Sequence, residues 1–376
     1  MTPTPEAWRA FFPAGAALAG VGAAAWALRL WGVGPPISPI EHGALMIFGV
    51  LGAFVQGFLL TAYPRQNQAS PPTRARIGLV WLLHVIAATS TLLGGGLSQG
   101  VRAILLASPW LVTLAWALPI ARVSLARSWD GTTFAVPCAL AALSLSAMLF
   151  PSYGSVALAG AVHGGLVVLA LAILDRVLPF FCQRPVPGYT GRRLPGFIPL
   201  LVALSAGRAL LPIAGDSAIG LAVLDVMLVG LVLRQVRGWA PWPAIKVPML
   251  GALYLGVAWM IVAWLLDALS VLGLVSAGSA PLHTLMLGGL GTLVVAIATR
   301  VARGHSNLPI EAGLGGGVAL VLVQAATVLR LRAALLGGAA SDFGMAALLF
   351  ALAFGWWFML VGRPGALARH GAHERP

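Results

Sequence analysis

Histidine is the residue type in this sequence best suited to carry chemistry, and its seven copies fall into two groups. For three of them we expect interfacial packing or solvation in polar segments: His305, His370 and His373. The other four lie inside or at the edge of long apolar runs: His42, His84, His163 and His283. Polar side chains at membrane depth are costly and usually mark function, and neutral imidazole is a frequent metal ligand. These four are therefore candidate metal ligands, with a structural hydrogen bond as the alternative for each.

The composition defines the environment in which these histidines must be positioned. Of the 376 residues, 59% are hydrophobic and 9% are charged, and the mean hydropathy is +0.93. Soluble domains are about 25% charged, so a soluble globular enzyme, a disordered protein and a fibrous protein are excluded. An all-α polytopic membrane protein in contact with the lipid bilayer remains. Cys138 and Cys182 are too few for a disulfide scaffold and form no CxxC motif.

The apolar runs predict about twelve transmembrane helices, because one span needs about 20 residues. The runs cover residues 11–31, 42–63, 77–97, 101–120, 132–150, 154–174, 196–212, 217–235, 247–270, 281–300, 313–331 and 343–362. The loops between them are too short for a soluble domain. We therefore expect one integral-membrane domain, residues 1–376, that ends in a short polar cytoplasmic tail, 364–376. No internal repeat is evident in the sequence.

The basic residues predict the orientation of these spans. The formal net charge is +13. The bases occur in small groups between the apolar runs, so membrane topology explains them better than a nucleic-acid partner, and none is expected. With both termini in the cytoplasm, the inner segments hold 18 of the 23 Lys and Arg residues, as the positive-inside rule requires. Arg330 and Arg332, at the outer end of run 313–331, are the exception.

Depth in the predicted bilayer separates the four histidines into two pairs. His42 and His283 begin runs that both cross from outside to inside, so both lie near the outer surface. His84 and His163 lie near mid-membrane and form a possible second metal site, with separate hydrogen bonds as the alternative.

Small residues accompany three of these histidines. One stripe of the second run contains His42, Met46, Gly49, Ala53 and Gln56. Glycines also flank His163 and follow His283. Such residues let a planar ligand approach the backbone, although ordinary small-residue helix packing explains any one of these motifs more simply.

Three segments together resemble the NnrS family of haem- and copper-associated bacterial membrane proteins linked to nitric oxide metabolism. The first is His42-Gly43-Ala44-Leu45-Met46-Ile47-Phe48-Gly49 with Gly57-Phe58-Leu59-Leu60-Thr61-Ala62 and Pro64; the second is Arg176-Val177-Leu178-Pro179-Phe180-Phe181; the third contains His283, Gly288, Gly291-Thr292, Thr299-Arg300, Gly304-His305 and Pro309. The family resemblance also implies twelve spans. The second run is similar, more distantly, to the catalytic subunits of haem–copper oxidases, where a histidine followed by Met-x-Phe binds low-spin haem.

Two departures from these patterns limit what the resemblance implies. The family often has a second histidine and a glutamate where this chain has Ala44 and Leu45, which argues against a copper site that needs that histidine. A haem–copper centre would also need paired histidines in the seventh span and two in the tenth. The seventh span has none and the tenth has only His283 near its start, so a complete oxygen or nitric oxide reductase is not expected.

The resemblance implies a multi-pass protein of the bacterial inner membrane that binds haem between His42 and His283. It would act in nitric oxide metabolism, denitrification or nitrosative-stress defence, by binding nitric oxide or by electron transfer with a redox partner that the sequence does not identify. Arg330 or Arg332 would hold the haem propionates, and only one of them can readily face inward because they are spaced i, i+2; the alternative is that both side chains extend to the membrane interface. From their depth, rather than from the resemblance, His84 with His163 would hold a further metal or haem. The alternatives are a transporter or permease without a redox cofactor, and an assembly or scaffold protein.

Overall fold

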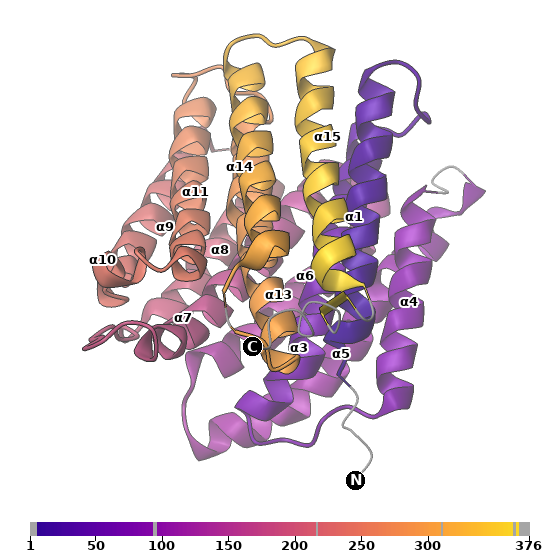
Figure 1. Ribbon diagram of the computed structural model, residues 1–376. Coiled ribbons are helices and arrows are strands. Elements are labelled where there is room, and N and C mark those ends of the chain that lie inside the picture. The colour runs from indigo at the N-terminus through magenta and orange to yellow at the C-terminus, as the bar shows by residue number, and fades with distance from the viewer. Residues whose placement is uncertain (1–5, 93–95, 216, 310, 364–365, 368–376) are drawn as a thin grey trace. The chain divides into compact units, whose positions relative to one another are not determined.

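The computed structural model describes residues 6–92, 96–215, 217–309, 311–363 and 366–367. The described chain consists of helices and their connections and contains no strand. Eleven of its helices are long and apolar enough to cross a membrane (Figure 1). The predicted all-α, multi-pass architecture is therefore confirmed. The predicted tail, 364–376, lies almost wholly outside the described residues.

The chain divides into two compact units. Unit 1 comprises Met1–Gly15, Ile37–Asp175 and Ile198–Asp216, and unit 2 comprises Ala16–Pro36, Arg176–Phe197 and Ser217–Pro376. Helix α1 (Trp8–Leu30) contributes to both. The expectation of a single domain over residues 1–376 stays a prediction, and each unit is described by itself below.

Unit 1 is built around one rod with three consecutive parts: α2 (Pro39–Ala44), the π-helical segment η1 (Leu45–Leu51) and α3 (Gly52–Gln66). Its other elements are α4 (Arg74–Leu92), α5 (Gln99–Arg127), α6 (Gly131–Gly160), the π-helical η3 (Ala161–Val167), the first part of α7 (Val168–Gln183) and most of α8 (Phe197–Ala214). Helix α4 packs against η1 and α5, and α5 packs against α6. Side chains of Ser38, Ser98 and Asp130 cap the starts of α2, α5 and α6.

The 53-residue element α6–η3–α7 folds back on itself at Gly154. Gly154 has φ +43° and ψ −108°, a conformation that glycine adopts far more easily than other residues. Beyond this turn the two halves run antiparallel. The Thr132 hydroxyl donates to the Ala172 carbonyl at 3.0 Å, and a Cβ on Gly165 would lie 2.5 Å from Leu143 Cγ. This element therefore supplies two spans, and every one of the twelve predicted runs has a helical counterpart.

Unit 2 contains the remaining spans. They are α9 (Ala218–Gly238), α11 (Pro248–Val271), the rod α12 (Ala280–His283)–η4 (Thr284–Gly291)–α13 (Thr292–His305), α14 (Gly313–Leu335) and α15 (Ala340–Trp357) with η5 (Phe358–Gly362), while α10 (Pro241–Ala244) is a short connection. Helix α11 packs against α9, η4 and α13, and α14 packs against α15 and η4. Helices α14 and α15 lie side by side in Figure 1.

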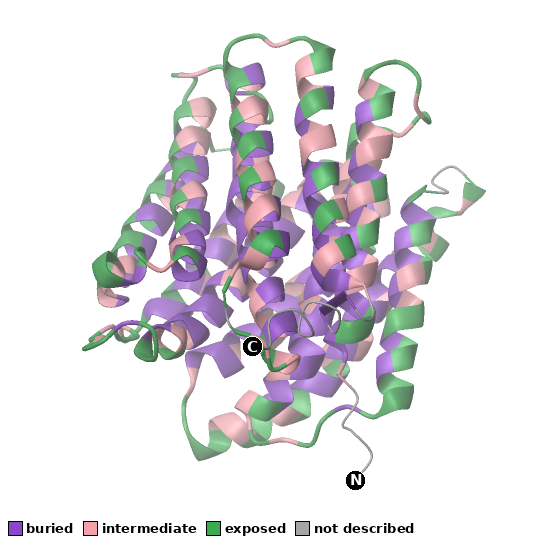
Figure 2. Cartoon of the chain, in the orientation of Figure 1, coloured by how far each residue is buried: buried purple, intermediate pink, exposed green. Residues whose placement is uncertain are grey.

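Burial differs sharply between spans. The most apolar window is 78% buried in Pro39–Gln66, 67% in Gly131–Gln183 and 72% in Ala280–His305, but 28–56% in the others. Helix α4, for example, shows exposed residues along much of its length in Figure 2. Exposed apolar side chains suit contact with lipid, whereas the three buried spans carry His42, His163 and His283.

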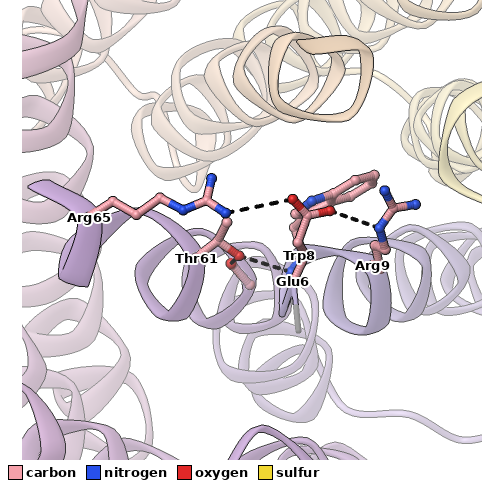
Figure 3. Close-up of polar contacts among 6 residues, drawn as sticks. Glu6, Trp8, Arg9, Thr61 and Arg65 are labelled. Carbon is pink, nitrogen blue, oxygen red and sulfur yellow. Dashed lines mark hydrogen bonds and ion pairs between the residues drawn. The ribbon is translucent and has the colours of Figure 1, made fainter. Parts of the chain in front are cut away.

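A polar cluster fixes the start of α1 against the end of α3 in unit 1 (Figure 3). The Trp8 amide donates to the Thr61 hydroxyl at 3.1 Å, which donates to the Gly57 carbonyl at 2.7 Å. The Glu6 carboxylate pairs with Arg9 at 2.9 Å and lies 3.7 Å from Arg65 Nη2. Two residues of the first family-like segment, Gly57 and Thr61, therefore have a packing and anchoring role.

Candidate functional site

All four histidines of the spans are associated with π-helical segments. His42 lies three residues before η1, His163 lies within η3, and His283 immediately precedes η4, while His84 bonds to a carbonyl of η1. A π-helical turn holds one more residue than an α-helical turn, and such turns are frequent at functional sites. This association was not predicted from the sequence.

His283 is held in one orientation by its own helix turn. Its Nδ1 lies 2.8 Å from the Ser279 carbonyl oxygen. A carbonyl only accepts hydrogen bonds, and the donor Arg330 Nη2 lies farther from Nδ1, at 3.3 Å. The shorter contact therefore favours the hydrogen on Nδ1 and the lone pair on Nε2. No partner for Nε2 is found among the described residues. A backbone carbonyl on one ring nitrogen and a free lone pair on the other is the arrangement typical of metal-binding histidines.

Arg330 lies beside this imidazole. Its Nη2 donates to the Ser279 hydroxyl at 2.6 Å and lies 3.3 Å from His283 Nδ1. Its guanidinium also stacks on Phe343, 4.5 Å from the ring centroid. The Nη1 atom is buried, and the described part of the chain offers it no hydrogen-bond partner. Arg332 is exposed. Of the two predicted arginines, the structure therefore brings only Arg330 to His283.

His42 is positioned by the helix start that precedes it. The Ser38 and Glu41 side chains form a capping box, Pro39 is the first residue of α2, and the His42 amide donates to the Ser38 carbonyl at 2.9 Å. The side chain is half-buried. His42 belongs to unit 1 and His283 to unit 2, so their predicted pairing across one cofactor stays a prediction.

His84 makes a structural hydrogen bond. Its Nε2 donates to the Gly49 carbonyl of η1 at 2.9 Å, and its ring is 1% exposed. A Cβ on Gly52 would lie 3.0 Å from both His84 Cε1 and Trp110 Cζ2, so the two rings share the space that this glycine leaves. Its Nδ1 is buried without a partner among the described residues, so the contact with Gly49 occupies one ring nitrogen only, and the metal role of His84 stays a prediction.

His163 lies in different surroundings from His84. It is 7% exposed, and its Nδ1 is buried without a hydrogen-bond partner among the described residues. Gly164 places η3 against α8, since its Cβ would lie 3.7 Å from the Cβ of Ala209, the residue that follows Arg208. The contacts found for His84 and His163 involve separate sets of residues, and their joint metal site stays a prediction.

The glycines near these histidines serve close helix packing. A Cβ on Gly288 would lie 2.7 Å from Trp259 Cγ, and one on Gly289 would lie 2.8 Å from Met260 Cγ. A Cβ on Gly164 would lie 3.2 Å from Ala142 Cβ. The simpler interpretation of these motifs, small-residue packing, is therefore the one that their contacts support.

The second and third family-like segments meet at one end of unit 2. The Arg300 guanidinium lies 3.6 Å from the ring centroid of Phe181. Thr299 accepts a hydrogen bond from the Trp357 indole at 2.8 Å, and Arg303 Nε donates to the Pro309 carbonyl at 2.7 Å. These motif residues hold the end of α13 in place. Within the described ranges, no group of three or more His, Cys, Asp or Glu side chains is arranged to hold a metal ion.

The fold and these contacts define the class: a multi-pass helical membrane protein with histidines at π-helical segments of its most buried spans. The family model for the NnrS protein matches residues 4–364, and the chain belongs to the NnrS family. Membership supports a nitric-oxide-related role in the membrane. No curated protein matches the chain. The more distant resemblance to haem–copper oxidases stays a prediction.

Proposed function

We propose that this NnrS-family protein binds haem in the bacterial inner membrane and acts on nitric oxide by ligand binding or electron transfer. The observation that carries the proposal is the state of His283. Its Nδ1 donates to the Ser279 carbonyl, and its Nε2 has no partner among the described residues, as would suit a histidine that binds haem iron.

The residues around His283 fit the two chemical features of haem, a metal and two carboxylates. Arg330 has a buried Nη1 atom without a partner in the described chain, and its Nη2 lies 3.3 Å from the imidazole. Guanidinium groups bind carboxylates through charge-assisted hydrogen bonds. A haem ligated by His283 would therefore find a partner for a propionate at Arg330.

Each of these residues has a separate task in the proposed site. The Ser279 carbonyl fixes the tautomer and plane of His283, and the Ser279 hydroxyl orients Arg330. When bound, haem iron supplies a site for nitric oxide or for one-electron transfer.

The optical spectrum of the purified full-length protein tests this proposal. We expect a Soret band in the oxidised protein that sharpens on reduction with dithionite and shifts when nitric oxide is added anaerobically. If the Soret maximum does not shift when nitric oxide is added, electron transfer remains as the proposed role. A colourless protein, purified from cells supplied with a haem precursor, would overturn the proposal and favour a transporter or scaffold.

A further inference from the structure

The twelve spans begin at regular intervals along the chain. The first spans of three successive groups begin at Trp8, Gly131 and Pro248. The third spans begin at Arg74, Phe197 and Gly313, and the fourth spans at Gln99, Ala218 and Ala340. The starts of the first, third and fourth spans are thus separated by 116–123 residues. A constant period of this kind is the signature of an internal repeat, here of four spans.

The second span of each group has the same special features. His42, His163 and His283 lie in these spans, 121 and 120 residues apart. Each lies within three residues of a π-helical segment or inside one. These spans also belong to the three most buried elements. A histidine, a π-helical segment and deep burial therefore recur together with the period of the spans.

In two of the groups, the third span carries an arginine 45 or 47 residues after the histidine of the second span. Arg330 lies 47 residues after His283, and its Nη2 is 3.3 Å from His283 Nδ1. Arg208 lies 45 residues after His163, and a Cβ on the adjacent Gly164 would lie 3.7 Å from the Cβ of Ala209. In the first group the corresponding positions, 87–89, are Ala-Ala-Thr. His84 lies in this third span and bonds to η1, so it does not correspond to the three histidines.

We propose that the chain consists of three tandem four-span repeats, and that His163 with Arg208 is the second repeat's counterpart of His283 with Arg330. His163 is then a further ligand for a transition-metal centre that carries acidic groups, and His84 only supports η1. The second part rests on the proposed function, because it takes His283 to be a metal ligand.

The surroundings of His163 support a ligand role independently of the repeat. The residue is 7% exposed, and its buried Nδ1 has no hydrogen-bond partner in the described chain. His84 also has a buried Nδ1 without a partner, but its Nε2 donates to Gly49, whereas neither nitrogen of His163 has a partner among the described residues. Buried polar groups without partners are uncommon and need an explanation, of which a bound metal is one. Arg208 disfavours a bare cation at this point but suits a metal centre that carries carboxylates or other anions.

Metal content per chain tests the proposal. Iron, copper and haem are measured in the purified full-length protein and in the variants His163→Ala, His283→Ala and His84→Gln, where glutamine keeps a donor for the Gly49 carbonyl. We expect His163→Ala to lose at least half of one metal, or to shift the Soret maximum, and His84→Gln to match the unmodified chain. If His163→Ala is unstable, His163→Met keeps the volume and is expected to shift the spectrum.

The possible outcomes separate this inference from the proposed function. Unchanged metal and spectrum in both His163 variants would overturn the inference while leaving a haem at His283 intact. Equal losses in His84→Gln and His163→Ala would also overturn it, because the repeat assigns them different roles. An unmodified protein without haem that still loses a metal in His163→Ala would overturn the proposed function and retain the inference.

Discussion

At the scale of single residues, the chemistry depends on which nitrogen of an imidazole is hydrogen-bonded to the protein. In His84, Nε2 donates to the Gly49 carbonyl, and Nδ1 is buried without a partner among the described residues. In His283, Nδ1 donates to the Ser279 carbonyl one helical turn earlier and lies beside Arg330. The two histidines therefore bond through different nitrogens and have different neighbours, and hydropathy alone does not distinguish them.

Arg330 and Arg332 provide a matched pair for the role of the guanidinium. Arg330→Leu removes the group beside His283 and is expected to lower haem retention during detergent dialysis by about tenfold, or ~1.4 kcal/mol. Arg332→Leu changes the same charge at an exposed position of the same helix and should retain haem fully. The measurement is the haem-to-protein absorbance ratio before and after dialysis. Equal retention in both variants would contradict the assignment of Arg330.

At this scale the sequence predicted candidates but not partners. It predicted that only one of two arginines spaced i, i+2 would face inward, because side chains two positions apart on a helix point in different directions. It did not predict that the inward one is Arg330, nor that Ser279 holds both Arg330 and His283. Those contacts depend on how α12 and α14 pack within unit 2, which no local pattern records.

At the scale of elements, glycine determines how closely the π-helical rods approach their neighbours. Gly288 faces Trp259 and Thr327, where a Cβ would lie 2.7 Å and 2.9 Å from their nearest atoms. By contrast, Gly230 of α9 has nothing within 4 Å of its Cβ position. Adding a methyl group at Gly288 should therefore disturb η4, whereas the same addition at Gly230 should not disturb α9.

Gly288→Ala is expected to destabilise the protein by about 1–3 kcal/mol, the usual cost of overpacking. Gly230→Ala, the same change at an open helical position, should be neutral or slightly stabilising. The thermal unfolding midpoint of both variants, followed in detergent by intrinsic tryptophan fluorescence, provides the comparison. A midpoint for Gly288→Ala no lower than that of Gly230→Ala would show that η4 can move away from α11 at little cost.

The spans themselves were predictable and the π-helical segments were not. A hydrocarbon layer about 30 Å thick demands about 20 apolar residues per span, so every run in the sequence has a helical counterpart. Hydropathy does not indicate where a helix ends once it has left the bilayer. Helix α7 continues to Gln183 and α13 to His305, both beyond the ends of the predicted runs. A π-helical turn differs from an α-helical one by a single added residue, which leaves no mark in composition.

At the scale of the whole molecule, charge predicts the orientation and the span starts predict a repeat. The inner segments of the predicted topology hold 18 of the 23 basic residues. The described residues form an even number of spans once the turn at Gly154 divides the longest element in two. Both termini should therefore lie on the cytoplasmic side.

Reporter fusions test this orientation. Alkaline phosphatase joined after Pro376 should be inactive because it stays in the reducing cytoplasm, and a fluorescent protein at the same place should mature and fluoresce. Phosphatase joined after Gly337, in the predicted outer loop between α14 and α15, should be active. The reverse pattern of activities would invert the topology and would place Arg330 near the inner surface.

The haem content of a His283 variant tests the central claim most directly. Haem is quantified as the pyridine haemochromogen in the purified protein, in His283→Ala and in His305→Ala, which changes a histidine at the other end of the same rod. The account predicts haem in the unmodified protein and in His305→Ala, and at least a tenfold loss in His283→Ala. Full haem content in a folded His283→Ala variant would contradict the claim that this imidazole binds the iron.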